Sequence, residues 1–212
     1  YSEQSGHYNF AAGPAMLPTE VLAQIREEMQ DWRGSGLSIL EQPFTSSAFK
    51  QLMAETDADL RALLEIPSNY RVLFMQGGAS AQFGLLPLNL LRPGQGADYL
   101  ESGHWARKAI AEGRRHAPVN VIASGADQDF TALPSPAHWR LDPLAGYCHI
   151  TSNETANGLQ LQEFPALPVP LVVDMTSDFL TRPADWPQTR YEAKARRLGH
   201  EVWYFRYQRK PD

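Results

Sequence analysis

The stretch Leu171-Val172-Val173-Asp174-Met175-Thr176-Ser177 decides the fold class of this 212-residue chain. Its dense apolar run favours a strand buried on both faces, as the strands of parallel sheets are. Further short strands are expected at residues 71–75, 119–123 and 147–150, and helices at residues 19–33, 46–64, 80–91 and 104–115. Alternating strands and helices predict an α/β fold with a mostly parallel sheet, in which the strand at residues 71–75 neighbours the strand that ends at Asp174.

Composition excludes several classes of function. The chain is 43% hydrophobic and 20% charged, which is typical of a globular protein, and its net charge of −5 gives no reason to expect nucleic acid as a partner. No apolar run approaches the ~20 residues that span a membrane. The single cysteine, Cys148, excludes an intrachain disulfide and fits a cytoplasmic location. The six histidines have no metal-ligand spacing, so no metal site is expected.

Asp174 directly follows the buried strand, where its carboxylate is poorly solvated unless a cation meets it. A protonated pyridine nitrogen, a metal ion or an arginine could each supply this positive charge. The alternative is that Asp174 caps the turn that follows.

Two other strand ends carry candidate binding residues. Gly77 and Gly78 stand between a strand and a helix, where free N–H groups can seat a phosphate, although glycines at such a place more often form a plain tight turn. Residues 153–155 could meet a ring substituent or form an Asx-type turn leading to Gly158. Trp105, at the start of a helix, is either a stacking platform for an aromatic ligand or a core residue.

Eight blocks occur in one order along residues 8–183: NFAAGPAMLP at 9–18, DWRGSG at 31–36, PSNYRVLF at 67–74, QGGASAQF at 76–83, PLNLL at 87–91, ADY at 97–99, SNET at 152–155 and VDMTSDFLTRP at 173–183. In this order they resemble the phosphoserine aminotransferases, which are class-V aminotransferases that use pyridoxal 5′-phosphate (PLP). The resemblance implies the three-layer, fold-type I large domain, here incomplete, with the C-terminal small domain missing.

The resemblance also implies a role for each matched position. Ala79 and Ser80 would bind the cofactor phosphate, Trp105 would stack on the pyridine ring, and Thr155 would contact the phenolic oxygen. Asp174 would pair with the pyridine nitrogen and keep it protonated. The implied reaction moves an amino group between glutamate and 3-phosphohydroxypyruvate, for serine and in many bacteria vitamin B6 synthesis. It implies a cytoplasmic homodimer.

The sequence departs from the family in two places. Phe44 and Thr45 stand where the family has basic residues that hold the anionic substrate, and Lys50 is the nearest cation. Residues 184–212 do not match the family: they form a net-basic tail of unknown origin that contains the strand candidate 202–207. The family lysine that forms the Schiff base is not found there, and Lys194, in a charged helix-like stretch, is a weak substitute.

Three hypotheses follow from these observations. The chain is an enzyme-family fragment that is inactive as given, with domain boundaries at 1–183 and 184–212. Alternatively, it is a non-catalytic degenerate subunit that binds PLP or a full-length partner. A nucleotide-binding α/β protein is the third, and the missing G-x-G-x-x-G motif argues against it.

Overall fold

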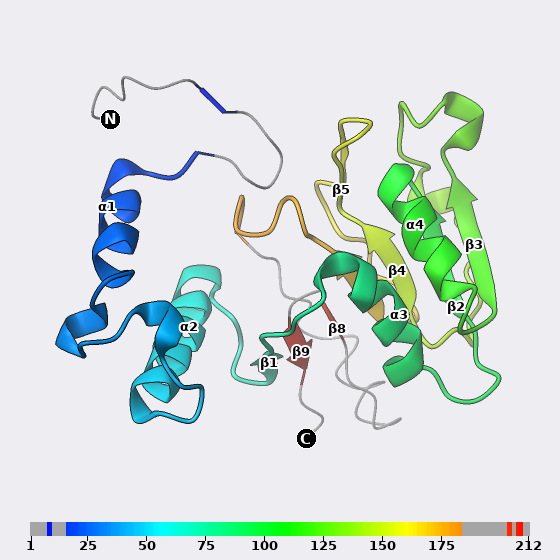
Figure 1. Cartoon of the computed structure of the whole chain (residues 1–212). Coiled ribbons are helices and arrows are strands. Elements are labelled where there is room, and N and C mark those ends of the chain that lie inside the picture. Colours follow the sequence, from blue (N-terminus) through cyan, green and yellow to red (C-terminus); the bar gives the residue numbers. More distant parts are fainter. Residues whose placement is uncertain (1–7, 10–15, 184–202, 205–206, 210–212) are drawn as a thin grey trace. The chain divides into compact units, whose positions relative to one another are not determined.

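A computed structural model describes residues 8–9, 16–183, 203–204 and 207–209 (Figure 1). It contains two compact units, Tyr1–Leu63 and Leu64–Asp212, which are described separately. The predicted boundary at Pro183 adjoins the undescribed residues 184–202 and stays a prediction.

The first unit is helical: it contains α1 (Thr19–Glu28), two short 3-10 helices, η1 (Trp32–Gly34) and η2 (Ile39–Glu41), and α2 (Ser47–Leu64). The predicted helix over residues 19–33 is therefore too long, and Pro18 rather than Thr19 is its N-cap. The reason for the early end lies in the following loop, where Trp32 N–H donates to Leu37 O (2.8 Å) and Gly36 N–H donates to Asp31 Oδ1 (2.7 Å). Both hydrogen bonds join residues within this loop, and Trp32 in it is buried.

The second unit contains a four-stranded sheet in the order β3-β2-β4-β7. Its strands are β2 (Ala97–Glu101), β3 (Val119–Ser124), β4 (Cys148–Thr151) and β7 (Leu171–Asp174). All three pairings are parallel, and every residue of β4 and β7 is buried. The predicted α/β fold with a parallel sheet is confirmed.

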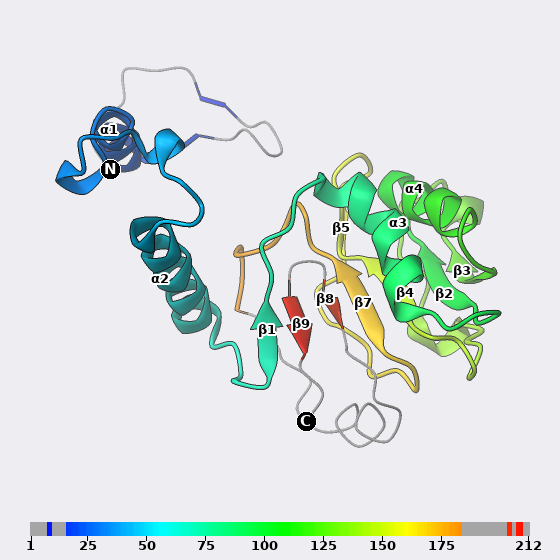
Figure 2. The same cartoon turned by 60° about the horizontal axis from the view of Figure 1, so that its bottom comes forward.

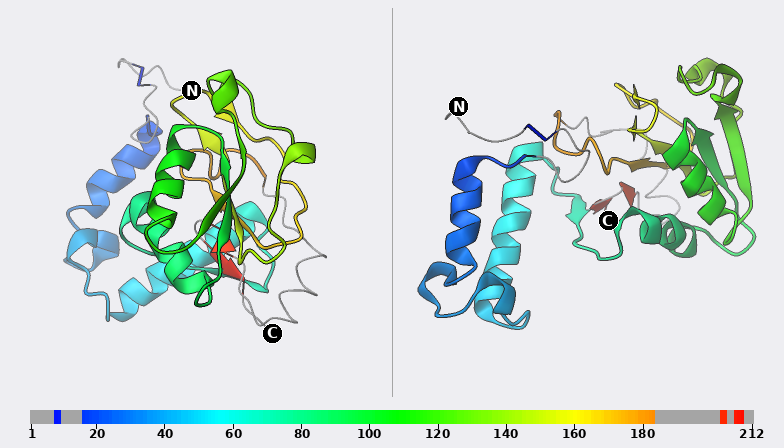
Figure 3. Two further views of the ribbon diagram at one scale, coloured as in Figure 1. Left: turned by 90° about the vertical axis from the view of Figure 1, so that its right-hand side faces the viewer. Right: turned by 45° about the horizontal axis from the view of Figure 1, so that its top comes forward.

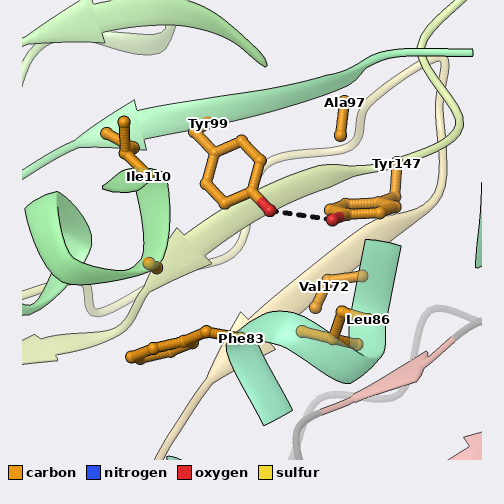
Figure 4. Close-up of a cluster of buried hydrophobic side chains, with 8 residues drawn as sticks. Phe83, Leu86, Ala97, Tyr99, Ile110, Tyr147 and Val172 are labelled. Atoms are coloured by element: carbon orange, nitrogen blue, oxygen red, sulfur yellow. Dashed lines mark hydrogen bonds between the residues drawn. The ribbon is translucent and has the colours of Figure 1, made fainter. Parts of the chain in front are cut away.

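Helices α3 (Gly78–Leu90) and α4 (His104–Gly113) cover one face of this sheet (Figure 2). Their apolar side chains share one core with those of the strands (Figure 4). Between β3 and β4 the chain forms two 3-10 helices, η3 (Ala126–Gln128) and η4 (Pro136–His138). No helix among the described residues is both long and apolar enough to cross a membrane.

Strand β1 (Tyr70–Val72) corrects the prediction that residues 71–75 form a strand of the same sheet as Asp174. β1 instead pairs antiparallel with β9 (Tyr207–Arg209), which pairs with β8 (Trp203–Tyr204). The aromatic stretch of the tail thus contributes two short strands, and β8 lies against β7 (Figures 2 and 3). Because these strands lie between β1 and β7, β1 makes no ladder with the parallel sheet.

A small antiparallel hairpin follows β4 and consists of β5 (Asn153–Glu154) and β6 (Leu159–Gln160). Its turn is held by the carbonyl of Glu154, which accepts from Asn157 N–H (3.1 Å) and Gly158 N–H (2.8 Å). A turn does lead to Gly158, but it is a backbone turn on the Glu154 carbonyl and not the predicted Asx-type turn, because the Asn153 side chain donates to Ser177 Oγ instead.

The hydroxyls of Tyr99 and Tyr147 form a hydrogen bond of 2.8 Å inside the core (Figure 4). Both side chains are at most 1% exposed. Burial raises the pKa of Tyr99 to about 12 and raises the pKa of Tyr147 as well, so both hydroxyls stay protonated.

We expect Tyr147→Phe to lower the free energy of unfolding by about 1–3 kcal/mol, because it leaves the Tyr99 hydroxyl buried without a partner. The double variant Tyr99→Phe/Tyr147→Phe should lose less than the sum of the two single variants, since it removes both hydroxyls together. Urea unfolding of the parent chain and the three variants measures this coupling. Strict additivity would contradict it.

Candidate functional site

Asp174 ends β7 and is 5% exposed. Its Oδ1 accepts from Thr176 N–H (3.0 Å) and from Thr176 Oγ1 (2.6 Å), so this oxygen does cap the following turn. Its Oδ2 has no hydrogen-bond donor among the described residues. Burial raises the pKa of Asp174, the bonds from Thr176 lower it, and the charges of Glu154 and Asp178 raise it further. The carboxylate of this buried residue thus offers one oxygen, Oδ2, that suits a cationic donor.

The first turn of α3 follows two glycines in left-handed conformation, Gly77 (φ 97°) and Gly78 (φ 60°). A Cβ on Gly77 would lie 2.6 Å from Ala81 Cβ, so space as well as backbone conformation requires glycine. Ala79 is half-buried and Ser80 is exposed, and their N–H groups meet no acceptor within the described part of the chain. Free amides at a helix N-terminus bind anions.

Trp105, in the first turn of α4, donates from Nε1 to Thr155 Oγ1 over 2.8 Å. Its indole is half-buried rather than part of the core. The ammonium of Lys108 lies 4.8 Å from the centroid of the Trp105 ring, and His104 meets the indole edge-on.

Glu154, between Asn153 and Thr155, is 1% exposed and was not predicted as a site residue. Its Oε1 accepts from Ser102 Oγ (3.0 Å) and Ala106 N–H (2.9 Å), and its Oε2 accepts from Trp105 N–H (2.8 Å). Glu154 stands three residues after the end of β4, in a polar segment, and no local sequence signal marks its role.

Asp178, which is 2% exposed, fixes the loop after β7. Ser152 Oγ donates to Asp178 Oδ1 (2.6 Å), and Arg182 Nη2 lies 3.3 Å from Asp178 Oδ2. Arg182 also donates to Leu161 O over 2.7 Å, which joins this loop to the segment after β6. These contacts hold the segment that follows Asp174.

The structure brings some of the predicted residues together. Trp105 and Thr155 are in direct contact, and Asp174 pairs in register with Thr151, four residues before Thr155. Ala79 and Ser80 begin a helix that packs on the same sheet, where the Phe83 ring lies 5.9 Å from that of His149 in β4. No hydrogen bond in the described part of the chain joins Ala79 or Ser80 to the other three.

The remaining predicted residues lie elsewhere. Phe44 and Thr45 belong to the first unit, in the turn before α2, and Phe44 is 78% exposed. Lys194 lies outside the described residues, so its role stays a prediction. The described residues hold no group of three or more histidine, cysteine or acidic side chains that could bind a metal ion.

Comparison with known sequences gives the family. The model of the family described as aminotransferase class-V matches residues 7–191. The phosphoserine aminotransferase of Azotobacter vinelandii is 52% identical over 179 residues, and that of Chromobacterium violaceum is 49% identical over 180. Each alignment covers 84% of this chain and 50% of the relative, so the chain spans about half the length of these relatives.

Solved structures agree with the sequences. The phosphoserine aminotransferase of Bacillus circulans subsp. alkalophilus is similar with a TM-score of 0.82 and 43% identity, over 86% of this chain and 51% of that one. A PLP-bound phosphoserine aminotransferase from Trichomonas vaginalis is similar with a TM-score of 0.78 and 38% identity, over 84% and 50%. The chain therefore belongs to the class-V aminotransferase family, and it is similar to part of the phosphoserine aminotransferases.

Proposed function

We propose that residues 77–178 form the PLP seat of a transaminase of the phosphoserine aminotransferase type. The observation that carries this proposal is Asp174, a buried residue whose Oδ2 has no donor in the described part of the chain while two further carboxylates stand near it. A protonated pyridine nitrogen would donate to Oδ2 and offset part of this negative charge. When bound, PLP supplies an electron sink for the bond changes at the amino acid.

The first turn of α3 would hold the cofactor phosphate. The N–H groups of Ala79 and Ser80 and the Ser80 hydroxyl supply donors, and the helix dipole favours a negative charge at this end. The absence of side chains at Gly77 and Gly78 lets the backbone approach the phosphate closely.

Thr155 would contact the phenolic oxygen of the ring, and its hydrogen bonding supports this. An indole N–H only donates, so Thr155 Oγ1 must be the acceptor in its bond with Trp105. The hydroxyl proton of Thr155 is then free to donate to an oxygen of the ligand. The same bond holds the indole of Trp105 beside Thr155, where it can stack on the ring.

The proposed reaction is amino transfer between glutamate and 3-phosphohydroxypyruvate, and assembly into a homodimer stays a prediction. Phe44 and Thr45 offer no guanidinium for a carboxylate or phosphate, so residues 42–47 would not hold the substrate as the family segment does. None of the four lysines stands in the family motif. We therefore propose that this 212-residue polypeptide holds PLP without turnover.

We expect Gly77→Ala to weaken PLP binding about tenfold or more, because the added Cβ meets Ala81 and displaces the amides that would hold the phosphate. Binding of pyridoxal, which lacks the phosphate, should be nearly unchanged. Quenching of tryptophan fluorescence measures both dissociation constants.

The control for this experiment is Gly94→Ala. Gly94 has a similar backbone (φ 78°) but no atom within 4 Å of an added Cβ, so it tests the backbone strain alone. Equal losses for PLP and pyridoxal, or a parent chain that binds no PLP, would count against the proposed phosphate seat.

The purified 212-residue chain should not convert phosphoserine and 2-oxoglutarate, since none of its four lysines stands in the family motif that supplies the general base, a role worth roughly 10²–10⁴ in rate. A coupled assay for glutamate measures turnover. Activity that disappears with Lys194→Ala would show that the tail supplies the missing lysine.

Asp174→Asn should raise the free energy of unfolding at pH 7 in the absence of PLP. Burial raises the pKa of Asp174 in the folded chain, so its contribution to stability is present below the unfolded pKa of ~3.9 and is lost as the pH rises through the folded value. The advantage of the variant should therefore fade as the pH falls towards 4. Added PLP should stabilise the parent more than the variant.

Melting temperatures at pH 4 and pH 7, with and without PLP, test this expectation. Asp98→Asn is the matched control, because burial also raises the pKa of Asp98, which lies near the amino end of β2. Its response to PLP should equal that of the parent. A melting temperature of Asp174→Asn below that of the parent at pH 7 without PLP would show that burial of the charge is not costly here.

A further inference from the structure

Helix α4 begins without a capping side chain of its own. Its N-cap, Gly103, makes no side-chain hydrogen bond, and the N–H groups of Trp105 and Ala106 donate instead to the two oxygens of Glu154. Glu154 lies 48 or more residues away in sequence, on the β5–β6 hairpin. The hairpin thus caps the helix, and the next residue, Thr155, receives the indole N–H of the same Trp105.

Close packing fixes this arrangement. A Cβ on Gly103 would lie 2.7 Å from Glu154 Cδ and 2.9 Å from Asn157 Oδ1, so any larger residue at 103 would displace the carboxylate. The carbonyl of Glu154 is held by the turn at Asn157 and Gly158. Both ends of Glu154 are therefore fixed, one to the hairpin and one to the helix.

We infer that Glu154 is a positioning residue, which fixes the Trp105 indole beside Thr155 in the orientation that stacking on the cofactor requires. The value of this orientation rests on the proposed PLP seat. Glu154 touches no cofactor atom itself: it acts through the backbone N–H of Trp105 and through the placement of Thr155. Without it, the indole keeps only the contact with the exposed Thr155 hydroxyl and its neighbours on α4.

A carboxylate is required here because three donors converge on two oxygens, and an ionised acid accepts on both. Glutamine has nearly the same shape but carries an NH₂ group in place of one oxygen. Whichever way this amide is turned, its NH₂ faces a backbone N–H of Trp105 or Ala106, and one helix amide loses its acceptor. Glu154→Gln therefore changes hydrogen bonding at the start of α4 with little change in volume.

The experiment labels the full 212-residue chain with 5-fluorotryptophan and records ¹⁹F NMR spectra without PLP, with the Trp105 signal assigned by Trp105→Phe. In Glu154→Gln we expect the Trp105 signal to shift or broaden while the Trp139 signal stays in place. A fluorescence titration with PLP should then show a dissociation constant raised about tenfold, the loss expected for one charge-assisted hydrogen bond.

Asp98→Asn is the control for a buried acid that only supports the fold. Asp98 accepts from Asn120 Nδ2 (2.7 Å) and Asp142 N–H (2.9 Å), so its replacement should leave the Trp105 signal and PLP affinity unchanged. Gly103→Ala is the second variant, because it displaces the Glu154 carboxylate while retaining its charge. Gly103→Ala should also shift or broaden the Trp105 signal. If Glu154→Gln does not fold, this variant decides whether Glu154 positions Trp105.

An unchanged Trp105 signal in Glu154→Gln, or a shift that Asp98→Asn reproduces, would overturn the positioning role. If the parent chain binds no PLP while Trp105 responds to Glu154→Gln, the positioning role stands and the proposed PLP seat fails. If PLP binds to the parent and Trp105 does not respond, the seat stands and the positioning role fails.

Discussion

The burial of negative charge at one edge of the parallel sheet constrains the rest of the second unit. Glu154, Asp174 and Asp178 are each at most 5% exposed, and the first and third raise the pKa of the second. Buried carboxylates are stable only when donors or cations surround them. Backbone N–H groups of α4 donate hydrogen bonds to Glu154, and the side chains of Ser152 and Arg182 donate to Asp178. Asp174 is the one whose second oxygen receives no donor from the described residues.

The difference in hydrogen bonding between these three carboxylates separates a candidate binding group, Asp174, from two structural ones, Glu154 and Asp178. The carboxylate oxygens of Glu154 and Asp178 accept hydrogen bonds from segments that are distant in sequence, and these bonds hold the segments together. The side chain of Asp174 accepts two hydrogen bonds, both from Thr176, two residues away, so these bonds join no distant segments. A chain that keeps such a charge buried lowers its own stability, and a cationic ligand would offset that cost.

The sequence predicts much of this because the signals are local. The apolar run before Asp174, the glycines before Ala79 and the helical spacing around Trp105 each mark an element within about ten residues, and these elements are present. The strand Ala97–Glu101 was missed, since Asp98 and Glu101 interrupt its apolar pattern although Asp98 is fully buried. Its acid is satisfied by Asn120 and Asp142, which no local pattern connects to it.

Long-range pairing accounts for the other errors. Residues 70–72 form a strand that ends earlier than the predicted strand 71–75, and its pairing with residues 207–209, and not its apolar pattern, decides which sheet it joins. Glu154 was overlooked for the same reason: in sequence it belongs to a polar turn, and only the fold brings it to the start of α4. Hydrogen bonds over such separations are set by topology, which short patterns do not encode.

The contacts that build the proposed seat all join residues between Gly77 and Arg182. None of the hydrogen bonds that fix Trp105, Thr155 or Asp174 involves the described strands of the tail. The geometry of the seat is therefore set within the family-matching part of the chain, separately from the lysine that would give it catalysis. Under the proposed function, cofactor binding and turnover are therefore separable, and a substitution in the seat should change PLP binding whether or not the chain turns over.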